Sequence, residues 1–363
     1  MIMEISNILN KSDFTKDDLI RLLAAEDDDL ELLYQKAAEV KLLNIGNKVY
    51  YRGLIEYSNI CAKNCFYCGL RCANQTISRY ALQDEEVIDA AGIAIDKKFG
   101  SIVIQAGERS DKKFVIKIAS ILKKIREISD GKLRVTLSLG EQTEETYQLW
   151  RESGAQRYLL RIETSNPELY HKIHPNDELH SYENRLQSLE LLRKTGYQVG
   201  TGVMIGLPFQ TLEDLANDLF FIKNHDIDMV GMGPYIENEN TPLYEFRNLL
   251  LSQEKRLELS IKMVAILRLM MPKINMAATT AMQTLHPQGR EMALKVGANV
   301  IMPNLTPLKY RDGYLLYDNK PNIHEETESS LARLKRSIEA AGCELALGDW
   351  GDSQHFSERV SKK

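Results

Sequence analysis

From about residue 50 onward, short apolar and β-branched segments alternate with longer segments of helical periodicity. Nearly continuous apolar strands indicate burial on both faces, and therefore a parallel sheet. Each short segment is followed by a helix-like stretch, such as DEEVIDAAGIAIDKKF or SYENRLQSLELLRKTG. Eight such repeats predict the α/β fold class, as a (β/α)8 barrel of the TIM type. The predicted strands are 49–58, 101–108, 133–141, 158–164, 197–208, 228–236, 275–282 and 299–307.

The first 45 residues show helical spacing only. TKDD at 15–18 has the features of a capping box before LIRLLA, and LELLYQKAAEVKLL repeats its apolar residues with helical spacing. We interpret the acidic run at 26–29 as a solvated helix start. No linker rich in Pro, Gly or Ser divides the later part of the chain. We expect a helical extension over residues 1–48 and a single barrel domain with a C-terminal tail over 49–363.

Composition and charge argue against several classes of function. The chain has 363 residues, 44% of them hydrophobic, and a formal charge of −5 without a basic stretch interleaved with aromatic residues, so we expect no nucleic-acid partner. The N-terminal sequence does not resemble a signal peptide, and we expect no membrane span. Four of the five cysteines fall between residues 61 and 72. This clustering indicates metal ligands in a reducing cytoplasm and not a secreted disulfide framework.

Polar residues gather where the predicted strands end. In barrels of this type, function lies at the C-terminal ends of the strands. A ring of polar side chains around one mouth predicts a pocket for a polar small molecule. Its members are Ser58, Asn59, 105–108, 138–141, 161–164, 206–208, 233–235, Thr279, Thr280 and Asn304.

The cysteine cluster follows the first predicted strand. Cys61, Cys65 and Cys68 form C-x3-C-x2-C, with Tyr67 before the last cysteine. Three thiolates on a short loop suit a 4Fe–4S cluster that keeps one iron open. With Cys72 as a fourth ligand, the alternatives are a structural zinc site and an electron-transfer cluster saturated by protein. We favour the open cluster, because zinc sites usually combine two separated pairs and the ferredoxin run has another spacing and a following proline.

This loop at the start of a βα barrel resembles that of the radical S-adenosylmethionine (SAM) superfamily. In that superfamily the open iron binds the amino and carboxylate groups of SAM, and one electron cleaves SAM to a 5′-deoxyadenosyl radical. The stretches RYLLRIETSNPELY, MIGLPFQTLEDL, DMVGMGPYI, AATTAM and GANVIMPNLTP narrow the resemblance to the HydE family of FeFe-hydrogenase maturases, over nearly the whole chain. The methylornithine synthase and biotin synthase families are the next most similar, but RYLLRIET and AATTAM fit the maturases better.

The resemblance implies roles for individual residues. Cys61, Cys65 and Cys68 would bind the cluster. The residues implied for SAM are Tyr67 at the adenine, Gly107 and Glu108 at the methionyl amine, Ser138, Glu163 and Arg185, with Gln105 and Arg161 beside them. Those implied for the substrate end are Thr136, Thr279, Thr280, Tyr310 and Arg311. From the residues alone, plainer roles stay open: an internal ion pair for Arg161 and Glu163, a solvated helix charge for Arg185, and packing for Tyr67 and the threonines.

The resemblance also implies a reaction and partners. The radical would act on a cysteine-bound iron carbonyl cyanide that a partner maturase delivers, and a scaffold protein would receive the product; an electron donor is implied as well. The alternatives are an amino-acid mutase of the methylornithine synthase type and a non-catalytic 4Fe–4S electron carrier closed by Cys72. Some relatives carry a second cysteine triad, but residues 73–342 contain no cysteine and Cys343 stands alone, so we expect no second cluster.

Overall fold

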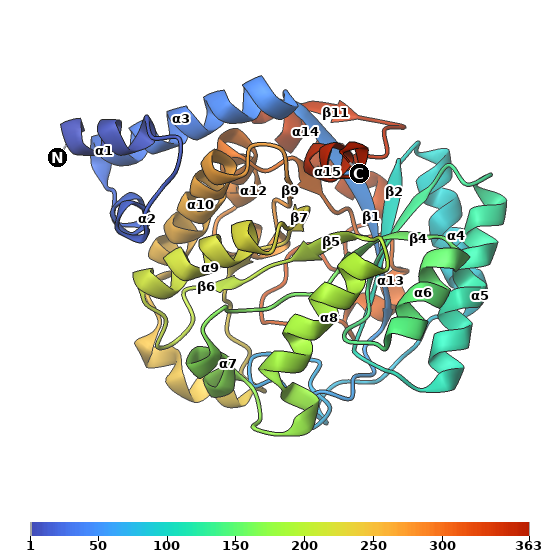
Figure 1. Ribbon diagram of the computed structural model, residues 1–363. Helices are drawn as coiled ribbons and strands as arrows, with labels where there is room; N and C mark the ends of the chain where they lie inside the picture. The colour runs from blue at the N-terminus through green and yellow to red at the C-terminus, as the bar shows by residue number, and fades with distance from the viewer. Residues whose placement is uncertain (1, 363) are drawn as a thin grey trace.

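A curled parallel sheet forms the centre of the computed structural model, which describes residues 2–362 (Figure 1). A parallel bridge between Ala277 and Val300 joins the two ends of the sheet, so the sheet closes on itself. This arrangement confirms the predicted barrel. In sheet order the strands are β10 (Val300–Ile301), β1 (Lys48–Ser58), β2 (Ser101–Ala106), β3 (Arg134–Ser138), β4 (Ala155–Leu159), β5 (Gln198–Thr201), β7 (Met229–Val230) and β9 (Asn275–Met276).

Two of the predicted strands are each divided in the structure. The segment 197–208 contains β5 and β6 (Met204–Ile205), and 228–236 contains β7 and β8 (Gly233–Pro234). β6 and β8 leave the barrel sheet and pair with each other. The break lies where two glycines meet, since a Cβ on Gly202 would be 2.1 Å from the carbonyl oxygen of Gly231. Close approach of the two backbones therefore requires glycine here.

The prediction of a strand over 275–282 is wrong beyond Ala277. Helix α11 (Thr280–Leu285) begins there, with Thr279 in an extended conformation at its N-cap. Paired threonines favour a strand, but the residues that follow include Ala281, Met282 and Leu285, which are strong helix formers. The two threonines therefore lie at a strand-to-helix turn.

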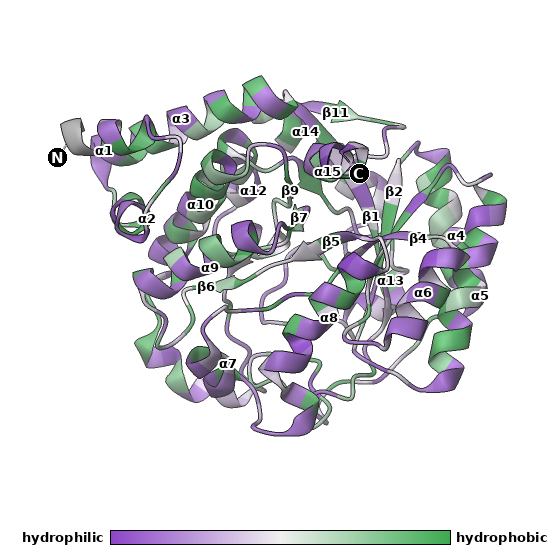
Figure 2. Cartoon of the chain, viewed as in Figure 1, coloured by the Kyte–Doolittle hydropathy of each residue, from purple (hydrophilic) through white to green (hydrophobic). Residues whose placement is uncertain are grey.

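Helices surround the sheet, with apolar residues toward it and polar residues toward solvent (Figure 2). Their starts carry ordinary caps, such as Asp111, whose carboxylate accepts the Phe114 N–H at 3.0 Å. Within residues 2–362, every helix is too short or too polar to cross a membrane. Besides α11, the α-helices of the barrel are α4 (Asp84–Asp96), α5 (Lys112–Ile128), α6 (Glu144–Ser153), α7 (Pro167–Ile173), α8 (Tyr182–Lys194), α9 (Leu212–Asn224), α10 (Gln253–Met270), α12 (Gly289–Val296), α13 (Leu308–Arg311) and α14 (Thr327–Ala340). Two further segments, η1 (Glu178–His180) and η2 (Pro242–Leu249), are 3-10 helices.

The N-terminal segment consists of α1 (Ile2–Leu9), α2 (Lys16–Leu23) and α3 (Asp27–Ile45). Thr15 and Asp18 form the predicted capping box: the Asp18 N–H donates to the Thr15 hydroxyl at 3.2 Å and the Thr15 N–H to the Asp18 carboxylate at 2.9 Å. α3 packs along α10 and α12 on the outside of the barrel (Figure 1). The helices predicted for the first 45 residues are confirmed, and the division at residue 48 stays a prediction.

The C-terminal tail covers the N-terminal end of the barrel. β11 (Glu344–Ala346) pairs with the start of β1, and α15 (Gln354–Ser361) follows. Between them, Asp352 pairs with Arg157 at 2.5 Å and accepts a hydrogen bond from Gln198 at 2.6 Å. Arg157 is fully buried. Although burial raises the pKa of Asp352, the nearby Arg157 guanidinium and the Gln198 hydrogen bond hold it below its usual value.

Replacing Asp352 with alanine should lower the free energy of unfolding by about 2–3 kcal/mol, because Arg157 would be left buried without a counter-ion. The pKa of Asp352 is lowered in the folded state, so its contribution is present at neutral pH and is lost as the pH falls through that lowered value. Denaturant melts at pH 7 and at about pH 3 test both statements. Glu39→Ala is the control, because its pair with Lys36 is exposed and should contribute at most about 0.5 kcal/mol. Equal losses in the two variants would contradict the account.

Candidate active site

The cysteine loop leaves the end of β1 and winds around two polar side chains. The amide of Asn59 donates to the carbonyls of Ser78 and Gly313, at 2.8 and 2.7 Å. The guanidinium of Arg79 donates to the carbonyls of Asn59 and Leu70, at 2.6 and 2.8 Å. These contacts hold the loop in a turn at the mouth of the barrel, although it has no helix or strand of its own.

Cys61, Cys65 and Cys68 are free and half-buried, whereas Cys72 is exposed. The Cys61 sulfur accepts N–H groups from Lys63 at 3.4 Å and from Glu108 at 3.3 Å. Burial raises the pKa of the Cys65 thiol to about 12, although the nearby Arg185 guanidinium acts to lower it. A set of three half-buried thiols, of which that of Cys61 accepts two backbone N–H groups, suits a cationic iron–sulfur group whose charge favours the thiolate form. Cys72 lies outside this buried set.

Gly107 allows the end of β2 to lie directly against the cysteine loop. Its N–H donates to the carbonyl of Ser58 at 2.9 Å. A Cβ at this position would lie 2.5 Å from the Ile60 carbonyl oxygen and 2.7 Å from the Cβ of Cys61. Only glycine permits this approach. The predicted pair Gly107 and Glu108 is therefore in contact with the first cysteine.

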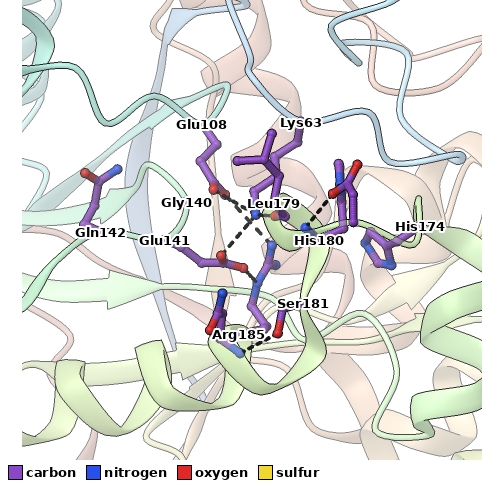
Figure 3. A network of polar contacts seen from close by, with 12 residues as sticks. Lys63, Glu108, Gly140, Glu141, Gln142, His174, Leu179, His180, Ser181 and Arg185 are labelled. Atoms are coloured by element: carbon purple, nitrogen blue, oxygen red, sulfur yellow. Dashed lines mark hydrogen bonds and ion pairs between the residues drawn. The ribbon is translucent and has the colours of Figure 1, made fainter.

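Four charged side chains, none of them more than 16% exposed, form a network next to the cysteine loop (Figure 3). Lys63 Nζ lies 3.1 Å from Glu108 Oε1 and 3.0 Å from Glu141 Oε2. Arg185 Nε donates to Glu141 Oε1, and Arg185 Nη2 lies 3.9 Å from Glu108 Oε2. Burial raises the pKa of Glu108, whereas for Glu141 the two cations outweigh burial and lower the pKa. The network joins the cysteine loop, the ends of β2 and β3, and α8.

Arg161 and Glu163 lie beyond the end of β4, contrary to the predicted strand over 158–164, and form the ion pair that the residues alone left open, with Arg161 Nε 3.0 Å from Glu163 Oε2. The carbonyl of Arg161 also accepts a hydrogen bond from Arg185 at 2.7 Å. Glu163 has a φ of +67°, in the left-handed region that non-glycine residues seldom adopt. Its N–H donates to the Gly202 carbonyl at 3.0 Å and its carbonyl accepts the Met204 N–H at 2.9 Å. Such a held conformation costs about 1–3 kcal/mol and is typical of functional sites.

Tyr67 is held by a histidine that the sequence did not single out. Its hydroxyl lies 3.3 Å from His174 Nε2, and His174 Nδ1 lies 2.9 Å from the Tyr170 carbonyl. Burial lowers the pKa of His174 well below its usual value, so the ring is neutral. A neutral ring that donates from Nδ1 accepts the Tyr67 hydroxyl at Nε2. The pair packs against an apolar group that contains Ile173 and Leu207.

At the predicted substrate end, two hydroxyls lack partners. The Oγ1 atoms of Thr136 and Thr279 are buried and have no hydrogen-bond partner among the described residues. Unpartnered buried hydroxyls are costly and suit a polar ligand. The Thr280 hydroxyl accepts from Arg290 Nη2 at 2.6 Å. Arg290 was missed, because an arginine ten residues along a different helix gives no sequence signal.

Gln105 and Ser138 are neighbours in register on β2 and β3. The Gln105 side chain hydrogen-bonds with Tyr314, which belongs to the segment 312–322. Lys320 of the same segment pairs with the buried Glu56 of β1 at 2.5 Å. This segment therefore lies across the mouth of the barrel, and its contribution was not predicted.

Tyr310 and Arg311 are placed apart from the other predicted residues. The Tyr310 hydroxyl donates to the carboxylate of Glu86 at 3.0 Å, and its ring stacks on Tyr80. Glu86 lies in the first turn of α4, on the outer layer. Arg311 donates to the backbone carbonyls of Thr306 and Glu325 at 2.7 and 2.8 Å. The contacts of both side chains are therefore structural: Tyr310 bonds and stacks with other side chains, and Arg311 bonds with backbone carbonyls.

Comparisons with known proteins agree with the geometry. The pattern of the radical SAM superfamily matches residues 55–222. The chain is 42% identical to the FeFe-hydrogenase maturase subunit HydE of Thermotoga maritima, over 98% of this chain and 99% of that protein. It is 28% identical to 3-methylornithine synthase of Methanosarcina acetivorans, over 93% of this chain and 92% of that protein. The crystal structure of methylornithine synthase matches with a TM-score of 0.78 at 26% identity, over 95% of this chain and 97% of that chain.

Replacing Cys61, Cys65 or Cys68 with serine should remove most of the iron bound after anaerobic reconstitution, because each thiol belongs to the buried set. Cys72→Ser should keep the iron content of the unaltered protein, because this side chain is exposed. Iron and sulfide assays on all four variants give the answer. Loss of the cluster in Cys72→Ser would show that a fourth thiolate closes it.

Asp218 of α9 supports the turn after Glu163, and its protonation should make stability depend on pH. Its Oδ1 accepts the Ser165 N–H at 2.6 Å, and burial raises its pKa to about 7. The folded protein therefore binds a proton that the unfolded chain has lost above about pH 4, so stability falls as the pH rises from about 4 to 7. Asp218→Asn keeps the acceptor and should melt at a more nearly constant temperature between pH 5 and 8. An unchanged pH dependence of the melting temperature would refute this assignment.

Proposed function

The chain belongs to the HydE family of the radical SAM superfamily, and from this premise we propose that it converts a precursor of the diiron site during FeFe-hydrogenase maturation. It is a radical SAM enzyme that uses a 4Fe–4S cluster and SAM. The proposed substrate is a cysteine-bound iron carbonyl cyanide. The observation that carries the proposal is the 42% identity with HydE over both full lengths, together with three buried thiols at the mouth of the barrel.

Cys61, Cys65 and Cys68 would hold the cluster and leave one iron without a protein ligand. When bound, the cluster supplies the electron that cleaves the sulfonium of SAM to the 5′-deoxyadenosyl radical. The protein's part is to hold SAM beside the open iron and to exclude water from the reaction. The two backbone N–H groups that donate to the Cys61 sulfur support the role of this cysteine as a cluster ligand, because hydrogen bonds to the sulfurs of a cluster tune its reduction potential.

SAM is a zwitterion with a ribose diol, so its site needs a cation, an anion and hydroxyl or amide groups. Arg185 is the proposed partner of the SAM carboxylate and Glu163 of a SAM hydroxyl or amine, with Arg161 orienting Glu163. Both lie on the side of the mouth where Tyr67 would contact the adenine. The remaining proposed contacts are Gly107 and Glu108 at the amine, with Ser138 and Gln105 nearby.

The substrate end is proposed to lie among Thr136, Thr279 and Thr280. The unpartnered hydroxyls of Thr136 and Thr279 support this choice, since a polar ligand would satisfy them. Tyr310 keeps its proposed place at the substrate end only if its contact with Glu86 opens. The segment 312–322 covers this end from outside.

The proposed partners are a maturase that delivers the substrate, a scaffold that receives the product, and an electron donor. The name of the Thermotoga maritima relative, a hydrogenase maturase subunit, supports this assignment. We propose that the enzyme acts in the cytoplasm, because three cysteines that must stay free of disulfide bonds require a reducing compartment. The proposed barrel domain extends over 49–363.

An amino-acid mutase of the methylornithine synthase type is the second candidate. The fold likeness over 95% of the chain favours it, since the two barrels share their arrangement. A non-catalytic electron carrier needs Cys72 as a ligand, and the exposed position of that side chain argues against this candidate.

Formation of 5′-deoxyadenosine distinguishes these candidates. With dithionite and SAM, the cysteine-bound iron carbonyl cyanide should accelerate 5′-deoxyadenosine formation at least about tenfold, about 1.4 kcal/mol of transition-state stabilisation. Free amino acids should leave the rate unchanged. Thr136→Val should reduce the acceleration while leaving SAM binding intact, because it removes only the proposed substrate hydroxyl. Acceleration by an amino acid and not by the iron complex would favour the mutase.

A further inference from the structure

Lys63 lies between the first two cysteines in the sequence, and its side chain reaches into the charged network (Figure 3). The side chain is 5% exposed. Its ammonium contacts Glu108, Glu141 and the carbonyl of Leu179. An ammonium has three donors, and here each meets an acceptor from a different segment: the end of β2, the end of β3 and the turn before α8.

Lys63 and Arg185 divide the oxygens of the same two carboxylates. Lys63 Nζ lies 3.0 Å from Oε2 of Glu141, and Arg185 Nε contacts Oε1 of the same carboxylate. Lys63 Nζ also lies 3.1 Å from Oε1 of Glu108, whereas Arg185 Nη2 is 3.9 Å from Oε2 of Glu108. Arg185 therefore contacts Glu141 through Nε and the Arg161 carbonyl through Nη1, while its Nη2 stays 3.9 Å from Glu108.

The charge balance makes this division important. Two cations and two anions are buried together, so removal of one cation leaves a surplus negative charge. The nearest remaining cation for Glu108 would be Arg185, and a bidentate contact with a carboxylate is the geometry that a guanidinium favours. Without Lys63, Glu108 would compete with any other carboxylate for Arg185.

The backbone around Lys63 is also fixed, so the side chain is held in this position. The N–H of Asn64 donates to Nε2 of His180 at 2.8 Å, and His180 Nδ1 lies 2.6 Å from Asp177. The carbonyl of Lys63 accepts the Cys72 N–H at 2.8 Å. The turn 177–180 thus holds the cysteine loop from the side of α8, while Lys63 holds it from inside.

We propose that Lys63 is a positioning residue for SAM binding: it keeps Glu108 off Arg185, so that Nη2 of the guanidinium stays available to the carboxylate of SAM. The same contacts join the loop that carries the cluster to the arginine that would hold SAM. Lys63 touches neither SAM nor the reacting atoms, and it acts through Arg185. The inference rests on the proposed role of Arg185.

The test compares SAM with decarboxylated SAM, which lacks the carboxylate that would contact both Arg185 and the open iron. For each ligand, the variant is therefore compared with the unaltered protein. Dissociation constants are measured by anaerobic calorimetry on reconstituted protein. Lys63→Met should weaken SAM binding on the order of 10- to 100-fold, the usual effect of removing a residue that orients a ligand-binding group. The dissociation constant of decarboxylated SAM should change less than about threefold, because this ligand has no carboxylate for Arg185 to bind and therefore does not depend on the orientation of that side chain. Lys63→Arg should restore most of the SAM affinity.

Lys262→Met is the matched control. Lys262 is a lysine of α10 whose side chain is 3% exposed and which bonds with Glu258 at 2.7 Å and with the Leu23 carbonyl at 3.0 Å, away from the cysteine loop. It should lose stability without losing SAM affinity. If Lys63→Met does not fold or bind iron, Lys63→Gln, which keeps two N–H donors but no charge, takes its place with the same expectations.

The outcomes separate the inference from the proposed function. Equal weakening for SAM and decarboxylated SAM would make Lys63 a support of the loop alone and would overturn the inference. Unchanged SAM affinity in Lys63→Met would overturn it as well. Failure of the unaltered, reconstituted protein to bind SAM would refute the proposed function itself, and the inference with it.

Discussion

The site depends on a balance of four buried charges, Lys63, Glu108, Glu141 and Arg185. Buried ions are stable only when they are paired and hydrogen-bonded, so these side chains must come together whenever the chain folds. Because they belong to the cysteine loop, to β2 and β3, and to α8, their pairing brings the loop to the ends of the parallel strands. The three thiols then lie at the mouth of a closed barrel, beside an arginine and a glutamate suited to a zwitterionic ligand.

The two ends of the barrel are built differently. At the base, the C-terminal tail places Asp352 against the fully buried Arg157, although Nε and Nη1 of that guanidinium have no hydrogen-bond partner among the described residues. At the mouth, the Thr279 hydroxyl is buried without a partner among the described residues, and Glu163 has a left-handed backbone. Unpartnered polar atoms therefore occur at both ends, but the free thiols and the strained backbone occur at the mouth. For this reason we place the chemistry at the mouth.

The sequence predicted those features that depend on residues close together in the chain. Strand hydrophobicity predicted the barrel, and the spacing of Cys61, Cys65 and Cys68 predicted their common position. The prediction failed for Thr279 and Thr280, where β-branched residues precede a helix. Contacts between distant residues gave no signal: Arg157 and Asp352 are 195 residues apart, and Tyr67 and His174 are 107 apart. Lys63 stood inside the motif, but only the fold reveals that it faces two carboxylates.

The central claim is that the three-thiol cluster keeps an open iron that SAM occupies. Electron paramagnetic resonance of the anaerobically reconstituted, dithionite-reduced protein tests it most directly. The account predicts that the spectrum of the reduced cluster changes when SAM is added, in the unaltered protein and in Cys72→Ser alike. A spectrum that is the same with and without SAM would mean that the protein itself fills the fourth position, and would contradict the account.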